Sequence, residues 1–134
     1  MPPGLTPLAL AAVAADQSFP PSARLLRRRE YERVLRAPQW RASNRCLRVA
    51  VRSNELGRPR LGIAAPKRAV RRAVDRSRAK RLIREGFRVE AATLPSVDIV
   101  VGVKRDAAWT GNPALFAALH ELWERLRCAS LDTS

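Results

Sequence analysis

The sequence is poor in cysteine, acidic residues, histidine and aromatic residues, and it has no long hydrophobic run. Its two cysteines, Cys46 and Cys128, are too few for a disulfide framework and form no CxxC motif or Cys/His cluster for zinc. This usage indicates a reduced, cytoplasmic protein. The apolar run from Leu8 to Ala15 is too short to span a bilayer and lacks a basic flank, so we expect residues 1–17 to be a disordered extension.

The scarcity of acids and histidine argues against a nuclease site in the protein itself. The 12 Asp and Glu residues are scattered, and no pair or trio is spaced to hold two metal ions. The single histidine, His120, has no evident nucleophile or carboxylate partner, and Ser77 has no base beside it. We therefore expect no catalytic residue, no metal site and no small-molecule substrate in this chain.

Positive charge is present in excess. Lys and Arg total 26, of which 23 are Arg, and the formal net charge is +14, while 46% of the residues are hydrophobic. A chain of this length and composition forms about one folded domain rather than a disordered tail. Because each neutralised phosphate releases condensed counterions, such a charge favours a polyanionic partner, and nucleic acid is the first candidate.

The first half of the chain predicts one helix and two strands. A helix is expected near residues 27–36, between a Pro pair and Pro38. In "CLRVAVR", residues 46–52, the large apolar residues Leu47, Val49 and Val51 alternate with Arg48, Ala50 and Arg52, which predicts a strand with one buried face. A second strand, "RLGIAA" at 60–65, follows a turn with Asn, Gly and Pro, so a hairpin is expected.

The second half predicts a basic helix, a buried strand and an amphipathic helix. The unbroken apolar run Ile99–Val103 is typical of a central strand buried on both faces. In "NPALFAALHELWERLR", Asn112 is expected at the N-cap and Pro113 at the first helical position. The whole is an α+β fold, a small mixed β-sheet packed with about three helices, whose βαβ-like crossover carries the basic helix. We expect one domain over 18–128 and a tail over 129–134.

The basic segment "AVDRSRAKRLIREGFR", residues 73–88, divides into two faces on a helical wheel. The apolar side, expected to pack on the sheet, comprises Ala79, Leu82, Ile83, Gly86 and Phe87, and the opposite arc holds Lys80, Arg81, Arg84 and Arg88. Cations at 80, 84 and 88 recur about 6 Å apart along the axis, which matches a row of phosphates. A solvated helix face is the alternative, but like charges at this spacing repel, so an anionic partner is favoured.

The segment "RLGIAAPKRAVRRAVDRSRAKRLIREGFR" resembles the signature of the bacterial ribonuclease P protein subunit. The resemblance continues in "FPPSARLLRRREYERVLRAPQ", "LPSVDIVVGVKR" and "LHELWERL", and covers Phe19 to about Arg127. Two positions depart from the pattern: Ser77 replaces the usual Asn, and Arg68 replaces the second Lys of a pair. The resemblance implies a protein cofactor for an RNA subunit that performs magnesium-dependent removal of the 5′ leader of precursor tRNA.

The resemblance also implies two RNA-binding surfaces. The residues expected to contact the catalytic RNA, including those that extend the basic surface on either side of the motif, are Lys67, Arg68, Arg71, Arg72, Arg76, Ser77, Arg78, Lys80, Arg81, Arg84 and Arg88. The residues expected along a central cleft for the single-stranded leader are Phe19, Tyr31, Leu35, Leu47 and Val49. For Phe19 and Tyr31 the choice between base stacking and core packing stays open.

Other readings remain beside the resemblance. A ribosomal or general RNA-binding protein is supported equally well by charge alone. A metal-dependent nuclease domain is the weakest hypothesis, because the carboxylates it needs are missing. Trp40, Trp109 and Trp123 are interpreted as packing or interface residues, with Trp123 inside the apolar stripe of the last helix.

Overall fold

The computed structural model describes residues 21–129, so the expected extension over 1–17, Phe19 and most of the tail lie outside the described residues. The helices are Arg28–Arg36 (α1), Ala73–Glu90 (α2) and Asn112–Cys128 (α3). The strands are Trp40–Ser43 (β2), Leu47–Ser53 (β3), Arg60–Ala64 (β4) and Val97–Val103 (β5), and the short 3₁₀ helices are Pro21–Ala23 (η2), Ala91–Thr93 (η3) and Arg105–Trp109 (η4). Within this range no helix has the length and apolar character needed to cross a membrane.

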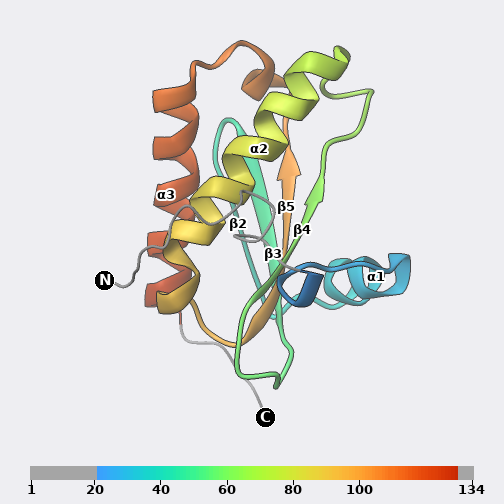
Figure 1. Ribbon diagram of the computed structural model, residues 1–134, viewed down its shortest axis with the longest axis vertical. Coiled ribbons are helices and arrows are strands. Elements are labelled where there is room, and N and C mark those ends of the chain that lie inside the picture. The colour runs from blue at the N-terminus through green and yellow to red at the C-terminus, as the bar shows by residue number, and fades with distance from the viewer. Residues whose placement is uncertain (1–20, 130–134) are drawn as a thin grey trace.

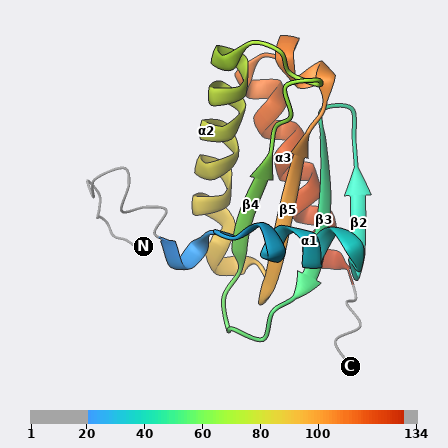
Figure 2. The same ribbon diagram turned by 90° about the vertical axis from the view of Figure 1, so that its right-hand side faces the viewer.

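The four strands form one mixed sheet in the order β2-β3-β5-β4. β5 pairs antiparallel with β3 over seven residue pairs and parallel with β4, to which α2 connects it. The predicted βαβ-like unit is therefore confirmed, but the predicted hairpin of β3 and β4 is wrong. β5 is buried along almost its whole length and takes the central position, and the 54–59 connection passes beyond its end (Figure 2). The edge strand β2 was not predicted, because four residues give too short an alternation.

Helices cover both faces of the sheet unequally. α2 and α3 lie side by side on one face, and α1 crosses the lower part of the other (Figures 1 and 2). Along β3, Leu47, Val49 and Val51 join the large core under α2 and α3. Ala50 points the opposite way, into a small second core that includes Val34 of α1. The rest of the α1 face is left without a helix.

The buried side of α2 is the predicted one. Its buried residues are Ala79, Leu82, Ile83, Gly86 and Phe87. Gly86 allows α3 to approach closely, because a Cβ at this position would overlap the side chain of Leu119. In α3, Trp123 is 1% exposed and its ring packs edge-on to Phe87.

The start of α3 differs by one residue from the prediction. Gly111 is the N-cap and Asn112 is already the first helical residue, so Asn112 is not the cap. The Asn112 side-chain oxygen instead accepts a hydrogen bond from Arg78 of α2 at 2.6 Å, which ties the two helices together. Pro113 follows within the first turn, where its missing N–H has no cost.

One buried ion pair attaches α1 to the sheet. Asp98 of β5 is 1% exposed and accepts two hydrogen bonds from Arg60 of β4, both at 2.8 Å. Arg60 also contacts Glu30 of α1 at 3.3 Å, and its hydrogen bonds to Asp98 raise its pKa. The Glu30 carboxylate accepts backbone N–H groups at the start of α1, first that of Arg27, and these bonds lower its pKa.

Candidate nucleic-acid interface

The basic residues around α2 fall into two groups, and the first group is free. In six of the expected RNA-binding cations the side chain makes no hydrogen bond or ion pair with any residue in the range 21–129: Lys67, Arg68, Arg71, Lys80, Arg81 and Arg84. All but Lys80 are exposed, and Lys80 is half-buried. The charged groups of this set, which we call the basic patch, are therefore available to phosphate.

The second group of cations is engaged within the protein. Arg76 donates to the carbonyls of Val70 and Arg71 at 3.0 and 2.8 Å, and so fixes the chain that leads into α2. Arg78 donates to Ala107 as well as to Asn112. The remaining members are Arg72, which lies 3.9 Å from Asp75, and Arg88, which pairs with Glu85.

Pairing with Glu85 has an electrostatic consequence for the predicted row of cations. Hydrogen bonds from Arg88 to the Glu85 carboxylate raise the pKa of Arg88. The negative charge of this carboxylate offsets much of the positive charge of Arg88. The free row of phosphate-spaced cations on α2 thus consists of Lys80 and Arg84, with Arg81 beside it. Ser77 is exposed and its side chain makes no hydrogen bond with the described residues.

A basic cleft lies on the sheet face that α1 leaves uncovered. Its volume is about 900 Å³, and it runs from Leu35 at the end of α1 across β2, β3 and β5 to the segment after β4. Its lining includes no carboxylate and five cations, which are Arg41, Arg48, Arg68, Lys104 and Arg105. Arg48 lies across Gly102 on the neighbouring strand, where a Cβ would come within 2.8 Å of the arginine side chain. Arg68 belongs both to this cleft and to the basic patch.

The structure places only some of the expected residues at the cleft. Leu35 is 52% exposed and borders it. Tyr31 packs instead over Gly62 of β4, and its hydroxyl accepts the N–H of Ile63 at 3.3 Å, so the core-packing reading fits it better. Phe19 lies outside the described residues.

Leu47 and Val49 need a correction. Their side chains are 0% and 2% exposed and belong to the core under α2 and α3, although Val49 also borders the cleft. The period of two along β3 turns Arg48 and Ala50 toward the cleft instead. The position of Arg48 at the cleft could have been predicted from the alternation of "CLRVAVR". The positions of Lys104 and Arg105 could not, because they depend on β5 being a central strand.

Known proteins resemble this chain over nearly its whole length. The family model described as Ribonuclease P matches residues 19–127. The chain belongs to the ribonuclease P protein family. The ribonuclease P protein component of Halorhodospira halophila is 55% identical over 91% of this chain and 100% of the relative, and that of Yersinia enterocolitica is 45% identical over 81% and 90%.

Solved ribonuclease P proteins share the fold. The Staphylococcus aureus protein at 2.0 Å resolution superposes with a TM-score of 0.72 at 26% identity, covering 77% of this chain and 94% of that one. The Thermotoga maritima protein gives 0.68 at 26% identity, with 76% and 96% covered. Family membership makes this chain part of an endoribonuclease holoenzyme that acts in tRNA 5′ processing together with an RNA partner.

Proposed function

We propose that this protein binds the catalytic RNA subunit of ribonuclease P through the basic patch and the 5′ leader of precursor tRNA in the cleft. The observation that carries the proposal is the junction of the two surfaces at Arg68, which lies in both. One RNA can therefore occupy the patch while a second lies in the cleft beside it. The protein would hold the leader next to the RNA subunit that cleaves it.

The chemistry of the cleft fits a single-stranded polyanion. Its cations have no carboxylate among the lining residues to neutralise them, so phosphate is their natural partner. Ala50, Val100 and the exposed Leu35 supply apolar surface between these charges. A positively charged groove that follows the phosphate backbone is part of how proteins hold single strands with little sequence preference.

The basic patch fits a structured RNA. Lys80 and Arg84 are one helical turn apart, so their charged groups can follow consecutive phosphates of a strand. The apolar side of α2 is fixed against the sheet and α3, which holds these cations in place. The helix backbone that carries these cations therefore loses little conformational entropy when RNA binds.

The chemistry of cleavage is assigned to the RNA subunit and its magnesium. Within residues 21–129 no group of three or more His, Cys, Asp or Glu side chains could hold a metal ion, so the residues present do not fit a magnesium site. The protein contributes binding, and we derive no chemical step from it. A cytoplasmic location is part of the proposal, supported by the free thiols of Cys46 and Cys128.

The first test is reconstitution. Protein prepared free of RNA is expected not to cut precursor tRNA, yet to stimulate its cleavage by the RNA subunit at low magnesium. Cleavage by the RNA-free protein would overturn the assignment of catalysis to RNA.

The second test separates leader binding from general RNA binding. Affinity of the holoenzyme is compared for precursor tRNA with and without its leader, using R41A/R48A and the matched control R125A on α3. Arg41, Arg48 and Arg125 are all exposed. We expect R41A/R48A to lose the leader-dependent part of the affinity and R125A to keep it. Equal affinity for both substrates in the wild-type complex would favour a general RNA-binding protein.

A further inference from the structure

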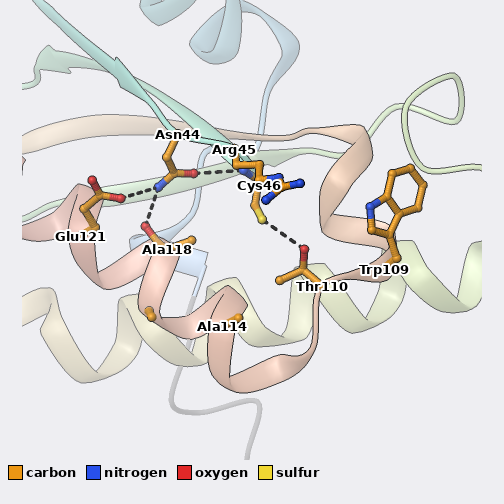
Figure 3. A pocket seen from close by; sticks show the side chains of 9 residues that line it. Asn44, Arg45, Cys46, Trp109, Thr110, Ala114, Ala118 and Glu121 are labelled. Carbon is orange, nitrogen blue, oxygen red and sulfur yellow. Dashed lines mark hydrogen bonds between the residues drawn. The ribbon is translucent and has the colours of Figure 1, made fainter.

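A second pocket lies outside the basic patch and the cleft. It has a volume of about 520 Å³ and lies between the turn that joins β2 to β3, the end of η4 and the outer side of α3. On its α3 side it is lined by the small residues Ala114, Ala117 and Ala118, of which Figure 3 labels Ala114 and Ala118. Arg45 and Trp109 border it. The small side chains on α3 leave the pocket open, and its volume is of a size that suits a single nucleotide.

Trp109 is the unusual residue of this pocket. Its side chain is 66% exposed, whereas Trp123 in the core is 1% exposed. An indole presents a large flat surface on which a nucleobase stacks without regard to its identity. Burial of Trp109 therefore requires a partner that the described fold does not supply.

The segment that carries Trp109 is held firmly. The Thr110 hydroxyl donates to the Asp106 carbonyl at 2.7 Å and also lies 3.3 Å from the Cys46 sulfur. On the other side, Arg78 binds Ala107 and Asn112, which flank Trp109 in the sequence. The indole is thus displayed from a fixed backbone, which lowers the entropic cost of stacking a base on it.

The charges around the pocket favour one orientation of a bound nucleotide. Arg45 donates through Nε to Asp106 at 2.9 Å, and its side chain is still 84% exposed, so its terminal NH₂ groups face solvent. Glu121 lies at the opposite end of the pocket from Trp109 (Figure 3). Asp106 offsets part of the charge of Arg45, but the exposed terminal NH₂ groups of Arg45 can still donate to a phosphate, which Glu121 at the other end repels. The anionic part of a nucleotide is therefore placed at the Arg45 side.

We propose that this pocket binds one unpaired nucleotide of the RNA subunit, with its base against Trp109 and its phosphate on Arg45. The inference rests on the proposed function, since it assumes that RNA lies on the basic patch. The RNA subunit is favoured over the leader because Arg78, on the helix that carries the patch, fixes the segment of Trp109. In Figure 1 the chain before α3 lies beside the first turns of α2.

The test measures affinity for the RNA subunit alone over a range of KCl concentrations, with W109A, W109F and R45A. W109A is expected to bind about tenfold more weakly or worse with an unchanged slope of log K against log salt, because stacking releases no counterions. W109F keeps a ring and is expected to recover much of the affinity. R45A is expected to lower the slope by about one phosphate contact.

Three results would overturn the inference. In the first, W109A binds the RNA subunit as tightly as the wild type. In the second, W109A loses affinity only for leader-bearing precursor tRNA, which would make the leader the source of the nucleotide. In the third, W109F binds as weakly as W109A and both unfold more easily, which would make Trp109 structural. The variant R81A separates this from the proposed function: if R81A weakens binding and W109A does not, only the pocket assignment fails.

Discussion

Arginines that bind RNA and arginines that hold the fold can be separated by two sets of substitutions on the same helix. Arg81 and Arg84 are exposed, and their side chains make no hydrogen bond or ion pair with the described residues, whereas Arg78 donates to Asn112 at 2.6 Å and to the Ala107 carbonyl at 2.8 Å. We compare R81A/R84A with R78A. The first pair is expected to change RNA affinity alone, and the second variant to change stability as well.

The magnitudes follow from the contacts. Each phosphate contact contributes about 0.7 to 0.9 to the slope of log K against log salt, so R81A/R84A should lower the slope by about 1.4 to 1.8 if each arginine meets one phosphate. Its unfolding free energy should stay within about 0.5 kcal/mol of wild type. R78A removes two charged hydrogen bonds, one of them exposed, and leaves a part-buried carbonyl unpaired, so we expect a loss of about 2 kcal/mol.

The assay is filter binding to the RNA subunit at several salt concentrations, paired with urea unfolding of each protein. The matched control is R125A, which removes one exposed arginine from α3. An unchanged slope in R81A/R84A would place the RNA surface elsewhere. Wild-type stability in R78A would refute the structural role that we assign to its two hydrogen bonds.

Three further predictions concern the scaffold, and urea unfolding measures each. D98N removes the buried carboxylate that accepts two hydrogen bonds from Arg60 and leaves this half-buried arginine with Glu30 alone, so it should cost about 2–3 kcal/mol, against less than about 1 kcal/mol for the exposed pair broken in D106N; similar losses would contradict this. G86A gains about 1 kcal/mol of helix propensity but overlaps the buried Leu119, at a cost of about 1–3 kcal/mol, so a net loss is expected and a gain would show that α3 moves freely. Because the pKa of Glu30 is lowered on folding, its contribution is fully present above the ordinary pKa of a glutamate and is lost as pH falls through the lowered value. The stability difference between E30Q and wild type should therefore shrink as pH falls below the ordinary value, and a constant difference would contradict this.

Periodicity predicted the helices better than the sheet. The buried side of α2 was correct in every residue, because a helix wheel depends only on local spacing. The order of the strands was not accessible in this way. A hairpin of β3 and β4 is the simplest reading of a short turn, but β5 is apolar on both faces and must lie between them. The order of the strands depends on pairing between segments that are far apart in the sequence, so local patterns cannot predict it.

The candidate site was predicted in part for a related reason. The free cations of α2 follow from the wheel, but sequence could not show that Arg76 and Arg78 are bound to carbonyls within the protein. In β3 the alternation was enough to predict which side chains face the cleft. The side chains of Leu47 and Val49 point into the core, so Arg48 between them points toward the cleft, which Val49 only borders.

Net charge alone does not explain why this protein has a directed RNA surface, because 12 acids could be spread evenly among 26 cations. They are not. Asp98 and Glu30 neutralise Arg60 at the base of α1, and Glu90 and Glu124 neutralise Arg127 on the outer side of α2 and α3. The cleft receives no lining carboxylate. The cations of the cleft and of the basic patch therefore have no carboxylate partner among the lining residues of the cleft or, for the patch, among the described residues, and a polyanion approaching the protein is drawn to these two adjoining surfaces.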